Sequence, residues 1–348
     1  MRVAALDLAK EWDRLVKQGK FTRPHKDEQL DIEYGVSESG GDYSFFVSGK
    51  EKDKNGIWQG VTTENFIDYA NEGVFQKQFN RLRKLRPGGQ DRKPGRQEDL
   101  QSGVEKCGFY CQEPKNPLSL LVRPLLGTLT STDSLKLRFA WNVYPNLAPF
   151  EPGGHFLFLP SGGFPELPHF PQVFTPFLLE DCMNICRSGA DLMVFFNSRH
   201  AGATQDHFHL QAVFHSSKSA KLAIESAIES AIKSPDRSNT GPARLSDYPL
   251  NALVYTLEDK AHCQNLEQDL RELQTKDVPF DLIFLAGQMV LVPRDINNEI
   301  VAEFPNLLAS MEVSGKFIIP ERDVFQRTTE ERIRVALGRI ALPLDCIA

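Results

Sequence analysis

Residues 207–215 read HFHLQAVFH, and apolar and polar side chains alternate along them. Successive side chains of an extended strand point to opposite faces, so a strand over these residues has one wholly apolar face. That face consists of Phe208, Leu210, Ala212 and Phe214. The opposite face carries three imidazoles and an amide, and it consists of His207, His209, Gln211, Val213 and His215. We therefore predict a strand that is anchored in a core on one side and presents histidines on the other.

The segment before this strand is built from small and polar residues. Residues 201–206 read AGATQD. Small residues allow backbone N–H groups to approach an anion closely, and a threonine hydroxyl adds a donor. A phosphate group is therefore expected against this segment, and its candidate binding residues are Gly202, Ala203, Thr204 and Gln205.

The alternation alone leaves three interpretations of His207 and His209 open. A neutral imidazole has a nitrogen lone pair near pH 7 and can attack phosphorus as a nucleophile. Two histidines on one face of a strand can also bind a metal ion, or they can form part of a polar surface. His209 is the central residue of 207–211 (HFHLQ), so it is the candidate nucleophile.

The longer stretch 197–211, NSRHAGATQDHFHLQ, resembles the active-site segment of the transferase branch of the histidine-triad superfamily. This branch includes diadenosine tetraphosphate phosphorylases and galactose-1-phosphate uridylyltransferases. Its pattern is an asparagine, a turn of small residues, and then His-x-His-Leu-Gln. Residues 142–145 (NVYP) and 152–160 (PGGHFLFLP) are similar to the paired strands of the nucleoside pocket. Residues 289–294 (MVLVPR) are similar to GDP-hexose phosphorylases.

The resemblance implies a role for each matching residue. His209 would attack the α-phosphorus of a nucleotide and form a covalent nucleotidyl-histidine, while a backbone carbonyl holds its other ring nitrogen. Gln211 would contact the phosphate, and His207 would help to position the site. Asn142 and Asn197 would bind ribose or phosphate, or cap turns.

Gln211 bears on which molecule accepts the nucleotide from the histidine in the second half of the reaction. Hydrolytic members of the superfamily usually have a third histidine at this place, whereas transferases have glutamine. The resemblance therefore implies transfer to phosphate or to a sugar phosphate, from a dinucleoside polyphosphate or a nucleoside-diphosphate sugar. The alternatives are a nucleotide hydrolase of the same superfamily and a nucleotide-binding regulatory protein without catalysis.

The order of the predicted elements favours an α+β fold with a histidine-triad-like antiparallel sheet, because helices and strands do not alternate regularly. The clearest predicted strands cover 135–143, 155–159, 191–197, 207–215, 252–257, 279–286, 289–293 and 316–320. The clearest helices cover 1–20, 173–187, 219–234, 258–274 and 328–337. We expect a catalytic half over 1–250, with a mobile basic loop near 81–100, and a second strand-rich half over 251–348.

Composition excludes several classes of protein. The formal net charge of −6 over 348 residues argues against a protein that coats nucleic acid. No apolar run reaches the length of a membrane span, and charge appears early at the N-terminus, so we expect a cytoplasmic protein. Cys107 and Cys111 have three residues between them, whereas paired zinc ligands usually have two. We therefore expect no metal cofactor, with half of a zinc site at this pair as the alternative.

Overall fold

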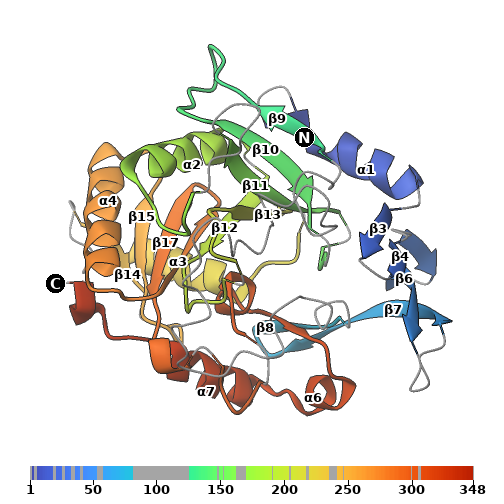
Figure 1. Ribbon diagram of the computed structural model, residues 1–348. Helices are drawn as coiled ribbons and strands as arrows, with labels where there is room; N and C mark the ends of the chain where they lie inside the picture. Colours follow the sequence, from blue (N-terminus) through green and yellow to red (C-terminus); the bar gives the residue numbers. More distant parts are fainter. Residues whose placement is uncertain are drawn as a thin grey trace.

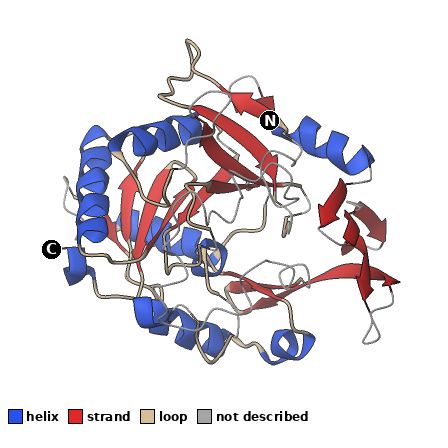
Figure 2. Ribbon diagram, in the orientation of Figure 1, coloured by secondary structure: helices blue, strands red, loops and turns tan. Residues whose placement is uncertain are grey.

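The computed structural model of the chain has two main sheets with helices around them (Figures 1 and 2). It describes residues 2–3, 6–18, 21–25, 28–32, 36–39, 42–52, 58–80, 125–146, 149–151, 153–161, 170–189, 191–203, 205–216, 219–234, 241–245, 247–298, 300–304 and 307–347. The expectations for the loop at 81–100, for Cys107 and Cys111, and for Thr204 lie outside these residues.

The larger sheet has nine strands, and all its neighbouring strands are antiparallel. Its order is β14 (Ala243–Arg244), β15 (Leu253–Thr256), β17 (Gln288–Pro293), β16 (Phe280–Leu285), β12 (Leu192–Asn197), β13 (Leu210–Phe214), β11 (His155–Ser161), β10 (Ala140–Pro145) and β9 (Gly127–Leu129). The α+β class and the antiparallel sheet are thus confirmed. The strands β9 to β13 and β14 to β17 meet at the β12–β16 pair, where Val194 lies opposite Phe284.

The smaller sheet has five strands and brings distant parts of the chain together. Its order is β18 (Lys316–Ile319), β8 (Phe75–Phe79), β7 (Trp58–Glu72), β6 (Asp42–Lys52) and β5 (Val36–Ser39). The pair β8–β18 is parallel, with Gln76 opposite Lys316, and the other pairs are antiparallel. Two short hairpins complete the strands, β1 (Arg2–Val3) with β2 (Leu6–Asp7) and β3 (Phe21–His25) with β4 (Glu28–Ile32).

The helices of the described residues are α1 (Leu8–Gln18), α2 (Pro176–Ser188), α3 (Ala223–Lys233), α4 (Lys260–Thr275), α5 (Ser310–Val313), α6 (Arg322–Arg327) and α7 (Glu330–Ile340), with 3₁₀ turns η5 (Ile296–Asn298) and η6 (Leu344–Ile347). Side chains cap the starts of α2, α4 and α7, among others. The hydroxyl of Thr175 accepts from Leu178 N at the start of α2, Asp259 accepts from Ala261 N and His262 N at α4, and Thr329 accepts from Arg332 N at α7. These bonds satisfy N–H groups that have no partner within a helix.

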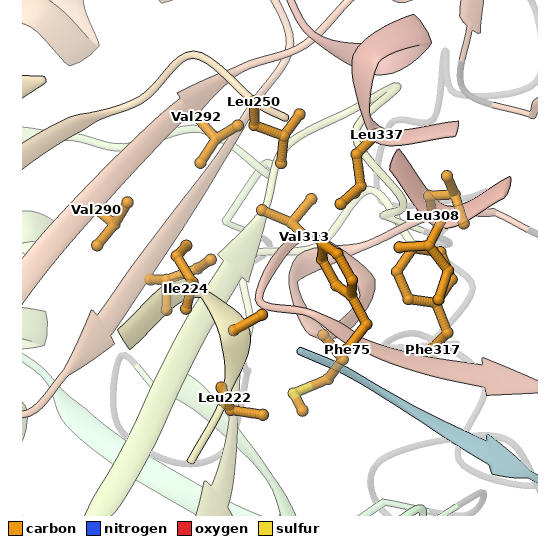
Figure 3. Packing of buried hydrophobic residues seen from close by; sticks show 14 of the residues in the cluster. Phe75, Leu222, Ile224, Leu250, Val290, Val292, Leu308, Val313, Phe317 and Leu337 are labelled. Atoms are coloured by element: carbon orange, nitrogen blue, oxygen red, sulfur yellow. The ribbon is translucent and has the colours of Figure 1, made fainter. Parts of the chain in front are cut away.

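Two cores lie on the two faces of the nine-stranded sheet. The first core contains Phe208, Leu210 and Ala212, and it is covered by apolar residues of α1, α2 and α4. The second core contains Val213 and the apolar residues of α3 and α7. Figure 3 shows part of it, and Phe75 and Phe317 of the smaller sheet belong to the same cluster as Ile224, Val290 and Leu337. The predicted alternation over residues 208–214 is therefore confirmed.

Two predicted strands begin later than expected, because side chains take the place of a neighbouring strand. The strand expected from Leu135 begins at Ala140, and the buried carboxylate of Asp181 accepts from Arg138 N at 2.7 Å and Phe139 N at 3.0 Å. The strand expected from His207 begins at Leu210. Its first backbone N–H groups bond instead to the segment at 170–172, as described below.

A buried ion pair lies where the two groups of strands meet. Arg294 donates to Asp281, and both side chains are almost fully buried. Arg294 also donates to the carbonyl of Leu308 at 2.9 Å, and Ser310 Oγ lies 3.2 Å from Asp281 Oδ1. Burial raises the pKa of Asp281 to about 6, although Arg294 and Ser310 act in the opposite direction. The cost of removing both charges from water is thus offset by several hydrogen bonds.

Replacing Arg294 by methionine should destabilise the protein by about 3–5 kcal/mol, because it leaves a buried carboxylate without its cation. The folded pKa of Asp281 lies above the usual value for aspartate, so the stability linked to this group is present at acid pH and is lost as the pH rises through about 6. The loss in Arg294→Met should therefore be smaller at pH 5 than at pH 8. Urea denaturation at the two pH values measures it.

Arg327→Met is the matched control, because Arg327 forms an exposed pair with Asp323 on α6 at 2.7 Å. It should leave the denaturation midpoint almost unchanged. Equal effects of the two substitutions would contradict the importance of the buried pair.

Candidate functional site

The backbone of His207 fixes the protonation of the His209 ring. His209 Nδ1 lies 2.8 Å from the carbonyl oxygen of His207, and both residues are buried. A carbonyl oxygen can only accept a hydrogen bond, so Nδ1 carries the proton. In the neutral imidazole, Nε2 then carries the lone pair. This is the arrangement that the resemblance implied for a nucleophilic histidine.

Gln211 lies two residues further along, in a small polar cluster. Its Oε1 accepts from His155 Nε2 at 3.0 Å and from Asn146 Nδ2 at 3.4 Å. His155 is fully buried, and its ring centroid lies 4.1 Å from that of Phe150. Within the described ranges, the hydrogen bonds of the Gln211 side chain use its oxygen. The amide orientation that these bonds fix makes the NH₂ group the donor toward a further ligand.

Asn197 ends the neighbouring strand β12. Like Gln211, it uses its side-chain oxygen in hydrogen bonds and leaves its NH₂ group for a further ligand. Its Oδ1 accepts from Ser310 N at 2.9 Å and from Ser310 Oγ at 2.6 Å. Ser310 begins α5, so this short helix holds the oxygen of Asn197. Among the residues that the structure describes, the side-chain bonds of Asn197 all involve Oδ1. Its NH₂ group, like that of Gln211, is the part of the amide suited to an anion.

These groups share one face of the sheet. Met193, Phe195 and Val213 belong to the second core, so alternation puts Asn197, His209 and Gln211 on this same side. Phe195 lies opposite Gln211 in the β12–β13 register. The structure therefore brings together three of the predicted residues.

The loop between β12 and β13 is held close to α5. Gly202 has a φ of 93°, which favours glycine, and a Cβ there would lie 2.6 Å from Ala309 Cβ. Ala201 and Ala203 are buried, and Gln205 is half-buried. His200 also has a positive φ, of 61°. The predicted residues Gly202, Ala203 and Gln205 thus lie in a tight loop beside Asn197.

Asn142 lies farther from the histidine. It is on β10, which is separated from β13 by β11, and its Oδ1 accepts from Thr128 Oγ1 at 2.8 Å. Asn142 lies opposite Leu159 on the face that also carries His155. Its binding role stays a prediction.

Gln172 is a residue of the site that the sequence did not reveal. It is almost fully buried, its Oε1 accepts from His209 N at 3.1 Å, and its Nε2 donates to the carbonyl of Asn197 at 2.8 Å. Asp206 Oδ1 accepts from Gln172 N at 3.3 Å, and Asp206 Oδ2 pairs with Arg199 at 3.0 Å. Gln172 and Ser310 belong to no periodic pattern, so no sequence signal pointed to them.

Two further features bear on alternative sites. In the described ranges no group of three histidine, cysteine, aspartate or glutamate side chains is arranged to hold a metal ion. A depression lined by Phe174, Leu179, Leu270 and Arg271 lies between α2 and α4. Its apolar residues belong to the first core, whereas His209 lies on the other face of the sheet.

None of the helices that the structure describes has both the length and the apolar character that a membrane-spanning helix needs.

Comparisons with known proteins place the fold. Residues 224–346 match the family model described as GDPGP1-like, C-terminal domain. The crystal structure of yeast Ap4A phosphorylase Apa2 in complex with Ap4A is similar to this chain, with a TM-score of 0.53 and 17% sequence identity over 86% of this chain and 90% of that chain. The Apa2 structure in complex with AMP gives a TM-score of 0.52 and 16% identity, with the same coverage of 86% and 90%. No curated protein matches the chain in sequence. The chain thus has a fold similar to that of yeast Ap4A phosphorylase Apa2, as the resemblance implied.

Replacing Gly202 by alanine should destabilise the protein by about 1–3 kcal/mol, because the new Cβ adds strain at a positive φ and meets Ala309. Thermal unfolding measures the loss. Gly287→Ala is the matched control, since Gly287 also has a positive φ, of 76°, but has open space where a Cβ would be. If Gly202→Ala costs no more than Gly287→Ala, the close approach to α5 has no energetic weight.

Proposed function

We propose that this chain is a nucleotidyltransferase of the phosphorylase type that forms a covalent nucleotidyl intermediate on His209. The observation that carries the proposal is the hydrogen bond from His209 Nδ1 to the carbonyl of His207. It leaves the lone pair on Nε2, on the same face as two amides whose oxygens are already engaged, those of Asn197 and Gln211.

The first half-reaction uses that lone pair. Nε2 of His209 attacks the α-phosphorus of the nucleotide, and a bond forms between phosphorus and nitrogen. The bond from phosphorus to the bridging oxygen breaks, and its electron pair leaves on that oxygen with the departing phosphate group. The imidazole becomes a cation, because Nδ1 keeps its proton. The carbonyl of His207 stabilises this charge through its hydrogen bond to Nδ1.

Charge that develops on the non-bridging oxygens needs donors that are already in place. The NH₂ groups of Asn197 and Gln211 meet this need. The backbone N–H groups around Gly202 and Ala203 are the other proposed donors, with Thr204 and Gln205 completing the binding segment. His207 positions the nucleophile through its main chain.

In the second half-reaction an acceptor oxygen attacks the same phosphorus. The new phosphorus–oxygen bond forms as the phosphorus–nitrogen bond breaks, and the electron pair returns to Nε2. Phosphate or a sugar phosphate is the proposed acceptor, because Gln211 occupies the position where hydrolytic relatives carry a third histidine.

Two classes of donor are proposed. A dinucleoside polyphosphate is favoured by the fold, since the yeast relative was crystallised with Ap4A and with AMP. A nucleoside-diphosphate sugar is favoured by the resemblance of residues 289–294 to GDP-hexose phosphorylases, and these residues lie within the match to the GDPGP1-like model. Both classes place an α-phosphorus next to a nucleoside, so one nucleophile serves either. Asn142 is the proposed contact to the nucleoside.

His209→Ala should abolish the nucleotidyl adduct and lower turnover on the order of 10⁴-fold or more, because it removes the nucleophile itself. The measurement is intact-protein mass after incubation with Ap4A, GDP-hexose or UDP-glucose, with and without added phosphate. The wild type should gain the mass of one nucleoside monophosphate group with a donor, and phosphate should discharge it.

His215→Ala is the matched control, because His215 is on the same strand segment but pairs with Glu225 at 3.0 Å, away from the loop at 198–206. It should keep the adduct. Turnover that persists in His209→Ala would refute the nucleophile, and discharge of the adduct by water at the same rate as by phosphate would make the protein a hydrolase.

A further inference from the structure

The ladder between β12 and β13 stops one hydrogen-bonded pair before the proposed nucleophile. Leu192 lies opposite Phe214 and Phe195 lies opposite Gln211, so the same register puts Asn197 opposite His209. His215 N donates to the carbonyl of Asp191 at 2.9 Å, which makes 191 and 215 a hydrogen-bonded pair. Hydrogen-bonded pairs alternate along an antiparallel ladder, so 197 and 209 form such a pair as well. A regular ladder would therefore carry a bond from His209 N to the carbonyl of Asn197.

The carboxamide of Gln172 stands in place of that bond. Its oxygen accepts from His209 N at 3.1 Å, and its nitrogen donates to the carbonyl of Asn197 at 2.8 Å. Both backbone groups are satisfied, yet the two strands are held apart by the width of one amide. On its other side β12 stays paired, because Asn197 lies opposite Asp281 of β16. The sheet thus opens on one side of Asn197 only.

The surrounding bonds keep Gln172 in place. Its backbone N donates to Asp206, and Asp206 is paired with Arg199. Phe208 N donates to the carbonyl of Phe170 at 2.6 Å. The segment 170–172 therefore runs beside 206–209 and is fixed to it at both ends, so the separation of the strands does not depend on a mobile side chain.

We infer that Gln172 is a positioning residue for His209, and that its carboxamide opens the sheet so that a phosphate group fits between Asn197 and the imidazole. The inference rests on the proposed function. Residues of a closed hydrogen-bonded pair have Cα atoms only about 5.5 Å apart, which leaves no room for a phosphate between their side chains. The opening provides that room and sets the direction from which Nε2 approaches phosphorus.

The test is Gln172→Glu, which keeps the shape of the side chain but makes its donor depend on pH. The neutral carboxyl accepts from His209 N with one oxygen and donates to Asn197 with the other, as the amide does. The carboxylate has no proton to donate, so one of its oxygens faces the carbonyl oxygen of Asn197 and the two acceptors repel each other. In a buried position the neutral form persists above the usual pH range of a glutamate. Adduct formation should therefore be near the wild-type rate at acid pH and fall at least tenfold as the pH rises, while nucleotide affinity changes less.

Gln172→Leu should slow adduct formation about 10–100-fold at every pH, because a leucine side chain cannot form a hydrogen bond to either strand. Gln274→Glu is the matched control. Gln274 makes the same pair of bonds to the backbone of Phe174, accepting from its N at 2.6 Å and donating to its carbonyl at 3.0 Å, but it lies on α4. It should share any general loss of stability and keep the wild-type pH profile of adduct formation.

A second readout does not depend on activity. The chain has eight histidines, so protein labelled with ¹⁵N-histidine gives few backbone amide signals, and His209→Asn identifies the one from His209. In Gln172→Glu that signal should move with pH, because its acceptor ionises, and it should stay constant in Gln274→Glu. If the His209 amide signal does not move with pH in Gln172→Glu, the hydrogen bond between His209 N and residue 172 is refuted. If both Gln172 variants form the adduct at the wild-type rate, the positioning role is refuted. A wild type that never forms an adduct refutes the proposed function instead, and the amide signal still decides the contact.

Discussion

The antiparallel pairing of β12 with β16 joins strands from two distant parts of the chain into one sheet. Without it, β12 would be an edge strand, and Asn197 would lose Asp281 as its neighbour across the sheet. β16 lies in the part of the chain that matches the GDPGP1-like C-terminal domain, so that part contributes residues to the candidate site. Ser310 and Asp281, which fix Asn197 directly or through one bond, both come from it.

Buried polar groups give this junction its specificity. An apolar junction would pack equally well in several registers, since neighbouring strands offer similar Val, Ile and Phe side chains. Ser310 bonds to both Asn197 of β12 and Asp281 of β16, which lie opposite each other, so a shifted register would leave buried polar groups unpaired. The same groups that hold the two sets of strands together therefore also determine which way the amide of Asn197 faces.

Much of the fold could be predicted from the sequence, since period-two and helical patterns depend on nearby residues alone. The strands at 155–159, 191–197 and 289–293 and the helix at 258–274 lie close to their predicted bounds. The starts of β10 and β13 could not be predicted, because Asp181 and Gln172 reach them from about 40 residues away. His209 and Gln211 stood out because polar groups interrupt an apolar alternation. Gln172 and Ser310 act through single long-range bonds that leave no trace in any local pattern.

The parallel pairing of β8 with β18 also has a consequence for biosynthesis. Lys316 leaves the ribosome about 240 residues after its partner Gln76, which at roughly 5–20 residues per second is a delay of ten seconds or more. During that time β8 can pair with β7, but the edge of β8 that later pairs with β18 lacks its partner strand. The nascent chain therefore carries an unpaired strand edge until residues 316–319 have been synthesised, and a chaperone that shields this edge would raise the yield of correctly folded protein.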